Sequence, residues 1–421
     1  MVNRLVAGAA PRASALAPFR VRSFRYQWPA DLATSWALEM ETIILGWYIL
    51  VETGSVLLLT LYASLRFVGT LLSPLFGVAG HRIGNKELLC LMRITYAVLA
   101  ATMMVLAFSG ALTPVHVFIL AGLMGSVSPS DLVMRYAVIG ETIPAHELLG
   151  ATSVSRTTQD SARIAGALTG AGIVAALGMT PAYAVIAGLY ALSFALTLRV
   201  GGPRRAEAAG AEDVSSWRDL KEGVAYVWHM PQLLAAMWLA FLVNLTAFPL
   251  VNSLLPYVAK EIYRTDQTGL GYVVASFAFG ALAGSLFLSR WGSAIRPARM
   301  MLIFTVIWYT LILLFAQMET LVAGMLVIMT TGCAQSLSMI SMSGMLLRNS
   351  DDRLRGRVMG IRMLAVYGMP VGLITAGPLI DRYGYPLTAM LYCSIGLALT
   401  FYIAFRWREH LWHADAPANR R

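Results

Sequence analysis

The sequence predicts an all-α integral membrane protein with twelve transmembrane helices, and three observations lead to that prediction. Of the 421 residues, 58% are hydrophobic and only 13% are charged, whereas soluble chains carry about 25% charged residues. The apolar residues form continuous stretches long enough to cross roughly 30 Å of hydrocarbon, for which a helix needs about 20 residues. The charged residues gather at the ends of these stretches.

Twelve apolar segments fall into two sets of six, with one long polar stretch between them. The first set occupies 30–51, 56–79, 88–109, 113–137, 149–178 and 180–200, and the second occupies 233–258, 268–289, 300–317, 319–347, 356–380 and 386–406. The segments are continuous rather than alternating in polarity, which favours helices over a β-barrel. We therefore predict a cytosolic N-terminal arm (1–28), a six-helix bundle (29–200), a cytosolic linker (201–231), a second, pseudo-symmetric six-helix bundle (232–408) and a cytosolic tail (409–421).

Basic residues concentrate in alternate loops. One set of loops and the linker are rich in arginine and lysine, whereas the opposite loops hold only Lys260, Arg264 and Arg382. The positive-inside rule then places both termini in the cytoplasm, with the chain crossing the inner membrane of a bacterial-type cell. Within the linker, apolar residues recur at helical spacing and predict a surface helix from Ser215 to Trp228.

The sequence also excludes several classes of function. The net charge of +10 does not indicate nucleic-acid binding, because the charges lie at segment ends. The spacing of Cys90, Cys333 and Cys393 fits neither a disulfide framework nor a zinc site. The sequence contains no nucleotide-binding P-loop, no metal-ligand spacing and no nucleophile motif. We therefore expect no enzymatic activity, no metal and no cofactor.

Three acids lie in or at the edge of the first apolar segment. A charge at bilayer depth costs roughly 2.5–3.5 kcal/mol on insertion scales, so such acids predict a carrier or pore for protons, cations or a polar substrate. Glu39 and Glu41 are about 200° apart on a helix, so one faces a central cavity and the other a neighbouring helix. We favour Glu39 for the cavity, with Asp31 within about 80° of it on the same polar track.

Two interpretations of these acids stay open. In the functional one, Glu39 or Glu41 binds and releases a proton during transport. In the structural one, the carboxylates are held by partners on other segments, for which the candidates are Arg66, Asp131 with Arg135, and an arginine of the fifth segment.

The fifth apolar segment carries a stripe of charge. Arg156, Asp160 and Arg163 stand at i, i+4 and i+7, so they share one helix face. This stripe would line a water-filled cleft or its cytosolic gate. The alternative is an interhelical ion-pair network with Asp131 and Arg135, which are also at i and i+4.

The two halves of the chain resemble each other internally. The alignment of 150–166 with 356–372 places Arg156 on Arg362. Repeated halves are typical of transporters whose substrate site lies between them near the midplane. Arg156 and Arg362 are then candidate gate residues, and their candidate partners are Asp131, Asp160 and Asp351/Asp352. The seventh and tenth segments add Asn244 and Gln335 as cavity candidates, with interhelical hydrogen bonding as the alternative for both.

These motifs together resemble the major facilitator superfamily over roughly residues 25–408. The loop made by Gly77, His81, Arg82, Gly84 and Lys86 is similar to the family's G-x-x-x-D-R-x-G-R-K loop. The run Arg355, Gly356 and Arg357 resembles the RGR loop of the enterobactin-exporter and macrolide-efflux branch, as does the W-x-x-x-x-x-T-G-S pattern at 47–55. The sequence departs from the family at His81, which stands where the family has an acid thought to latch the outward-facing state.

The resemblance implies a secondary active exporter of a small amphipathic molecule, a drug-like compound or a siderophore, that works by proton antiport with alternating access. One alternative is an uptake symporter or facilitator for a nutrient or organic anion, in which Arg156 and Arg163 hold the anionic group. A lesser alternative is a non-transporting membrane sensor. We expect a monomer whose partners are the lipid bilayer, protons and a small-molecule substrate, with no nucleic acid.

Overall fold

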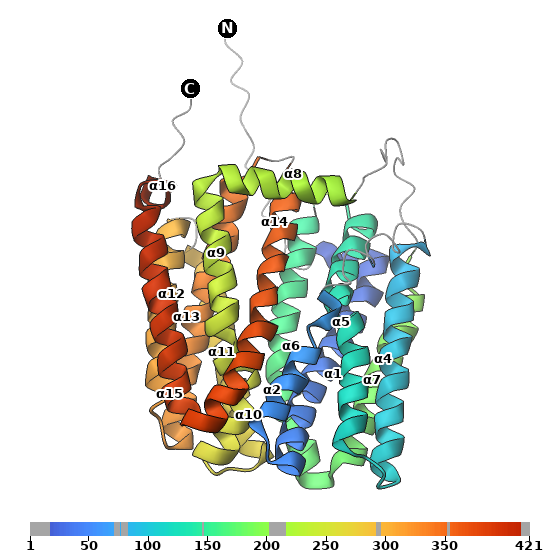
Figure 1. The fold of residues 1–421 in the computed structure, drawn as a ribbon. Helices are drawn as coiled ribbons and strands as arrows, with labels where there is room; N and C mark the ends of the chain where they lie inside the picture. The colour runs from blue at the N-terminus through green and yellow to red at the C-terminus, as the bar shows by residue number, and fades with distance from the viewer. Residues whose placement is uncertain are drawn as a thin grey trace.

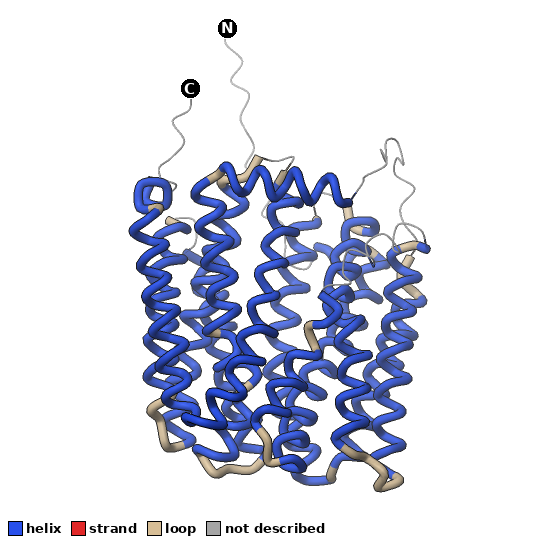
Figure 2. Tube along the Cα trace, viewed as in Figure 1, coloured by secondary structure: helices blue, strands red, loops and turns tan. Residues whose placement is uncertain are grey.

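The structure is a computed structural model that describes residues 17–70, 76, 83–144, 147–201, 216–291, 296–351 and 354–413. Helices make up nearly all of these described residues, and no strand occurs among them (Figure 2). Before the linker lie α1 (Arg22–Thr53), α2 (Val56–Leu65), α4 (Asn85–Phe108), α5 (Pro114–Thr142), α6 (Leu148–Leu177) and α7 (Met179–Leu198). After it come α8 (Ser216–His229), α9 (Pro231–Thr246), α10 (Leu255–Tyr257), α11 (Gln267–Trp291), α12 (Pro297–Phe315), α13 (Leu321–Arg348), α14 (Arg355–Leu364), α15 (Gly368–Arg406) and α16 (Arg408–His413).

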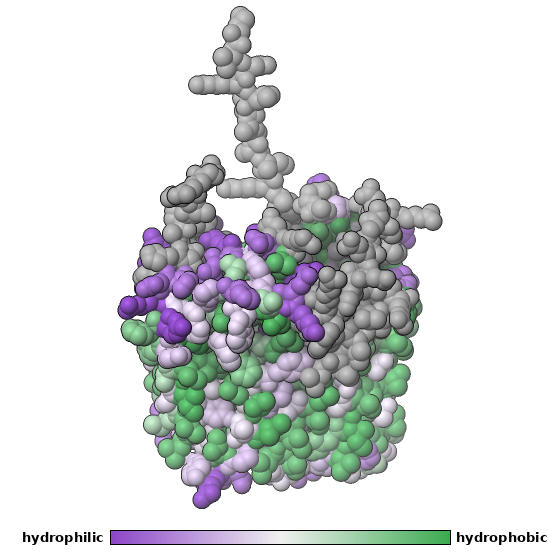
Figure 3. Space-filling model, turned by 45° about the horizontal axis from the view of Figure 1, so that its top comes forward, coloured by the Kyte–Doolittle hydropathy of each residue, from purple (hydrophilic) through white to green (hydrophobic). Residues whose placement is uncertain are grey.

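Within the described ranges, eight helical stretches are long and apolar enough to cross a membrane. They comprise α4, α5, α7, α9 with its extension to Ser253, α11, α12, α13 and the stretch from Arg357 to Arg406. Figure 3 shows the matching surface, in which hydrophilic residues gather at one end and hydrophobic residues cover the flank. The long helices α1 and α6 fall outside this set; α1 carries Asp31, Glu39 and Glu41, and α6 carries Arg156, Asp160 and Arg163.

The helices run side by side along the long axis of the molecule (Figure 1). Those before the linker gather on the right of Figure 1 and those after it on the left. The helix α8 crosses the end of both groups, nearly at right angles to them, and α16 lies at the same end. This is the surface helix predicted between Ser215 and Trp228, and its position fits the amphipathic spacing of its apolar residues.

Two contacts fix α8 to the neighbouring α14. The guanidinium of Arg357 forms an ion pair with Glu222 of α8. The backbone N–H of Asp351 donates a hydrogen bond of 3.2 Å to the hydroxyl of Tyr226. A side chain on Gly223 would come within 2.8 Å of Ile361, so the glycine lets the two helices approach closely. The helix between the two halves is therefore joined directly to the RGR segment.

The seventh predicted segment is a broken helix rather than a continuous one. After α9, residues Pro249–Ser253 and Val258–Ile262 form two π-helical segments on either side of α10. Prolines at 249 and 256 cannot donate the usual backbone hydrogen bond, and this loss favours the wider π spacing. The range of α15 covers the latter part of the eleventh predicted segment and all of the twelfth, which are two helices that meet at Gly384, where φ is 79° and ψ is 166°.

The two groups of helices contact each other through α6 against α11 and α2 against α15. Glycines make both contacts close. A Cβ on Gly271 would lie 2.7 Å from the Cβ of Ala171, and a Cβ on Gly377 would lie 2.5 Å from Oγ1 of Thr60. Both contacts lie near the start of α11 or α2, toward the end of the molecule opposite α8 (Figure 1).

The tightest helix crossing, between α11 and α13, predicts a stability effect. We expect Gly280→Ala to lower the free energy of unfolding by about 1–3 kcal/mol, because its Cβ would lie 1.7 Å from the backbone oxygen of Met329. Gly172→Ala in α6 is the matched control, since its Cβ would meet no atom within 4 Å. Thermal unfolding of the purified protein measures both, and equal unfolding temperatures would contradict the packing assignment.

Candidate functional site

A cavity of about 560 Å³ lies between the two groups of helices. On one side its wall is formed by residues of α1, α2, α5 and α6. On the other side it is formed by residues of α10, α11, α14 and their neighbouring turns. Most of the lining is apolar, including Leu132, Val274 and Phe277. The charged side chains on the wall are Glu39, Arg66 and Arg163. The cavity therefore offers room for an amphipathic molecule with a few fixed charges.

Glu39 and Arg163 form an ion pair across the wall of the cavity. The Nε of Arg163 lies 3.4 Å from Oε1 of Glu39, and their side chains remain 37% and 27% exposed. Close packing of α1 on α6 brings them together, since a Cβ on Gly166 would lie only 2.7 Å from the Cβ of Glu39. Because both side chains stay accessible, the pair can open when a proton or another ion takes the place of one partner.

Glu41 lies on the other side of α1, away from the cavity lining. Its residue is 9% exposed, and its Oε2 accepts a hydrogen bond of 3.1 Å from the hydroxyl of Tyr190. Tyr62 and Tyr183, both nearly fully buried, lie close enough to interact with it electrostatically. Arg66 attracts the same carboxylate from the cavity side without hydrogen-bonding it. Glu41 thus lies among tyrosine side chains, of which Tyr62 lines the cavity and Tyr183 and Tyr190 belong to α7.

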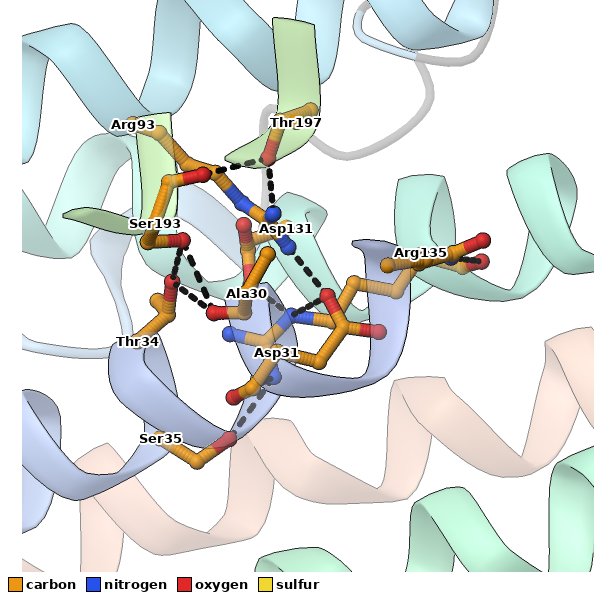
Figure 4. Close-up of polar contacts among 10 residues, drawn as sticks. Ala30, Asp31, Thr34, Ser35, Arg93, Asp131, Arg135, Ser193 and Thr197 are labelled. Carbon is orange, nitrogen blue, oxygen red and sulfur yellow. Dashed lines mark hydrogen bonds and ion pairs between the residues drawn. The ribbon is translucent and has the colours of Figure 1, made fainter. Parts of the chain in front are cut away.

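Asp31 belongs to a second, fully buried network outside the cavity (Figure 4). Its carboxylate forms an ion pair with Arg93 of α4 and lies 3.8 Å from Nε of Arg135. Arg135 in turn lies 2.5 Å from Asp131 on its own helix and donates a hydrogen bond of 2.7 Å to Ser35. The network closes with Arg93 donating to the hydroxyl of Thr197. It joins α1, α4, α5 and α7.

Hydroxyl groups extend this network around the first turns of α1. The hydroxyls of Thr34 and Ser193 lie 2.6 Å apart, and that of Ser193 donates to the carbonyl of Ala30 at 2.8 Å. Gln27 donates from its side-chain amide to the carbonyl of Arg135 at 3.0 Å. Figure 4 shows the side chains of Arg93, Arg135 and Ser193 gathered around the segment of α1 that holds Asp31. Two acids facing two arginines balance the charge there, which fits a structural role.

Arg93 is the participant in this network that sequence reasoning missed. It is 0% exposed and is among the largest fully buried side chains of the described chain. It lies inside the apolar segment 88–109, and a lone charge in such a segment was the available signal. Asp31 was expected beside Glu39 on the cavity track and is instead bound to Arg93 and Arg135. The pull of two buried arginines overrides the helical alignment with Glu39.

Asp131 was predicted as a gate partner of Arg156 and Arg362, and the structure contradicts this pairing. Asp131 is 2% exposed and pairs with Arg135, so it does not reach either arginine. Arg156 pairs within its own helix, with its Nε 3.8 Å from Asp160, and its side chain is 64% exposed. Arg362 donates a hydrogen bond of 2.5 Å to the hydroxyl of Ser343. The like charges of Arg156 and Arg362 lie close enough to repel each other.

The other predicted positions lie outside the cavity lining. The side-chain amide of Asn244 donates to the carbonyl of Ala240 on its own helix at 2.8 Å, and half-buried Gln335 sits on α13 away from the wall. Gly77, His81, Arg82 and Asp352 lie outside the described residues, and Gly356 lies in the first turn of α14. No group of three histidine, cysteine or acidic side chains that could hold a metal ion occurs in the searched part of the chain.

Three residues of the predicted loop motifs act at helix ends. Gly84 precedes α4 with a φ of 108°, a value that favours glycine, and Lys86 stands in the first turn that follows. Arg355 donates from Nε to the carbonyl of Leu347 at 2.9 Å, which joins the start of α14 to the end of α13. Together with the ion pair between Arg357 of α14 and Glu222 of α8, these contacts give the motif residues a structural role in connecting helices.

Comparison with known proteins agrees with this architecture. A model of the Major Facilitator Superfamily matches residues 32–373. The chain is 25% identical to the multidrug efflux pump Tap of Mycolicibacterium fortuitum over 354 residues, which cover 81% of this chain and 85% of that protein. It is 22% identical to macrolide efflux protein A of Streptococcus pyogenes over 362 residues, which cover 84% and 87% of the two chains.

Solved structures share the fold at lower identity. A transporter of the POT family in complex with 5-aminolevulinic acid gives a TM-score of 0.70 at 12% identity, covering 93% of this chain and 97% of the other. The nucleoside transporter NupG gives a TM-score of 0.63 at 15% identity, covering 92% and 99% of the two chains. At these identities the likeness concerns the fold.

The buried network predicts a strong effect of one arginine on stability. We expect Arg93→Met to lower the free energy of unfolding by about 3–5 kcal/mol, because it leaves the carboxylate of Asp31 without its main partner. The double variant Arg93→Met/Asp31→Asn should recover part of that loss. Arg199→Met, at an exposed position, is the control and should change stability by less than about 0.5 kcal/mol. Thermal unfolding in detergent measures all three, and strictly additive losses would contradict the coupling.

Proposed function

Because the chain belongs to the Major Facilitator Superfamily, we propose that it is a secondary active transporter that exports a small amphipathic molecule in exchange for protons. The observation that carries this proposal is the apolar cavity between the two groups of helices, with the Glu39–Arg163 ion pair on its wall. Two relatives named as a multidrug efflux pump and a macrolide efflux protein support the direction of transport. A drug-like compound or a siderophore fits the size and apolar lining.

The proposed membrane topology has twelve spans in two pseudo-symmetric bundles, 29–200 and 232–408. Helices lie at each of the predicted segments, and α8 occupies the predicted linker between the bundles. The basic loops and α8 then mark the cytoplasmic face of a bacterial-type inner membrane, with both termini on that side. In this orientation, the end of the molecule near α10 faces outward (Figure 1).

Proton exchange is proposed to occur at Glu39. Protonation removes the negative charge of its carboxylate, which breaks the attraction to Arg163. A proton that arrives from the outside is released to the cytoplasm after the halves rock, and substrate leaves in the other direction. Substrate bound against Arg163 competes with the ion pair, which couples the two fluxes. Glu41 is less suited to this exchange, because it is buried, hydrogen-bonds Tyr190 and does not line the cavity.

Alternating access requires that the contacts at the outer end can open. In addition to the glycine contacts at Gly271 and Gly377, one polar bond joins the halves there. The ammonium of Lys260 donates a hydrogen bond of 3.1 Å to the carbonyl of Leu50, in the last turn of α1. A cation at a helix C-terminus also interacts favourably with the helix dipole. We propose that Lys260 acts as a latch that holds the outer end closed.

Removal of the latch should increase access from outside. We expect Lys260→Met to raise the labelling rate of Ser253→Cys by an impermeant maleimide about tenfold, the factor that corresponds to losing about 1.5 kcal/mol from a charge-assisted hydrogen bond. The background protein carries alanine at 90, 333 and 393. Glu261→Gln is the control. Glu261 also pairs with Lys260, but both residues belong to the same helical segment, so this pair does not join the two halves. An unchanged rate would show that the bond does not hold the outer end closed.

The proposed coupling predicts which glutamate matters for proton flux. In liposomes with an imposed pH gradient, we expect a substrate among siderophores, macrolides and lipophilic cations or anions to trigger proton flux through the wild type. Glu39→Gln should abolish this flux, while Glu52→Gln, at an exposed position on the same helix, should leave it intact. The same flux is measured for Glu41→Gln and for the double variant Glu39→Gln/Glu41→Gln.

Three outcomes of this experiment would contradict the proposal in different ways. Full proton flux in the double glutamine variant would sink the coupling assignment. Substrate uptake down the same gradient would favour the symporter alternative. Substrate movement without proton flux would indicate a facilitator.

A further inference from the structure

Arg66 differs from the other charged residues of the cavity, because no described residue gives its side chain a hydrogen bond or an ion pair. It lies at the C-terminal cap of α2, half-buried, and faces the cavity. Glu39 is already paired with Arg163, and Glu41 hydrogen-bonds Tyr190 behind the wall. Among the described residues, the cavity wall therefore carries two positive charges and one negative charge.

We propose that the substrates are amphipathic organic anions and that Arg66 binds their carboxylate, sulfonate or phosphate group. This inference rests on the proposed export function and specifies the substrate class of the same cavity. Arginine presents several N–H donors in a planar array that matches the oxygens of such groups, so it can bind them in a bidentate way. A charge of the opposite sign also relieves the cost of holding a cation in low-dielectric surroundings.

The position of Arg66 explains how the cation is retained when the cavity is empty. Its own backbone ends α2, so the guanidinium lies near the negative end of that helix dipole. The carboxylate of Glu41 attracts it electrostatically without forming a bond that would occupy its donors. Both effects stabilise the charge and leave its N–H groups available to a ligand.

The cavity has a place for the apolar part of such a molecule. Leu59, Leu132, Val274, Phe277 and Met363 line the wall that Arg66 shares. These side chains come from α2, α5, α11 and α14, so a ligand bound among them would touch both halves. Burial of apolar surface contributes roughly 25 cal/mol per Å² and is independent of the charge of the ligand. The apolar body thus supplies affinity, and Arg66 selects the sign of the charge.

The charges nearer the α8 end of the molecule also favour an anionic substrate. On the face of α6 that carries Arg163, Arg156 lies about two turns nearer to that end. Arg362 of α14 is close enough to Arg156 for their charges to repel. Asp160 is the acid that pairs with Arg156. An entering anion therefore meets an excess of positive charge, which raises its local concentration.

A matched series of probes tests the charge preference directly. The probes are 1-pyrenebutyrate, 1-pyrenebutanol and 1-pyrenebutylamine, which share one apolar body and differ in charge. Binding to the protein in lipid nanodiscs is measured by energy transfer from tryptophan to pyrene, with empty nanodiscs as the background. We expect the wild type to bind the carboxylate about tenfold more tightly than the alcohol, and the amine more weakly than either.

Variants of Arg66 and of Arg199 then test whether Arg66 causes the preference for the carboxylate. Arg66→Gln should weaken binding of the carboxylate about tenfold and leave the alcohol unchanged. Arg66→Lys should keep the sign of the preference but reduce its size, because lysine keeps the charge and loses the planar pair of donors. Arg199→Gln is the matched control, because Arg199 is also an arginine at a helix C-cap in the right-handed helical conformation, but on the exposed surface. A variant that fails to fold is identified by thermal unfolding, and the probe series on the wild type still decides the sign of the charge.

The outcomes separate this inference from the export function. If the amine binds as tightly as the carboxylate, if no carboxylate binding occurs, or if Arg66→Gln keeps the preference, the inference is wrong. Proton flux triggered by a cationic substrate, together with such a result, would leave export standing and overturn the anion assignment alone. Absence of flux with every compound would instead count against the export proposal, whatever the pyrene probes show.

Discussion

The pairing of charged side chains on α1 is the constraint on which the N-terminal half depends. Each of the acids at 31, 39 and 41 has a partner on another helix: Arg93 of α4, Arg163 of α6 and Tyr190 of α7. In a membrane an unpaired carboxylate would cost several kcal/mol. These pairs therefore fix the rotation of α1 against three neighbours, and through Gly166 they also fix how closely α1 approaches α6.

The C-terminal half is held together by different contacts. Its buried polar side chains are mainly hydroxyl groups, with Thr246 and Tyr309 2.7 Å apart and Thr305 and Ser338 also 2.7 Å apart. Such contacts contribute modestly and carry no net charge. The cavity consequently has one wall that supplies charge and another that supplies apolar surface. This difference lets a single molecule interact with both halves in distinct ways.

The fold class could be predicted from the sequence because a bilayer demands long apolar helices, which leave a simple pattern. The break in the helix after Thr246 was only partly visible, since prolines indicate weakened hydrogen bonding but not the π spacing that replaces it. Charge partners were harder to predict. Which helix a charge faces depends on how each helix is rotated and how closely its neighbours approach. The sequence placed Asp31 on the same face as Glu39, and only the packed structure shows that it pairs with Arg93.

The two π-helical segments around α10 have a mechanical consequence. A π turn holds one residue more than an α turn, and one residue corresponds to about 100° of rotation. If Pro249–Ser253 returned to α-helical bonding, all that follows would turn by that angle, and the ammonium of Lys260 would swing away from the end of α1. The extra residue thus allows two discrete rotations of the outer end, one with π-helical and one with α-helical bonding, and disfavours the rotations between them.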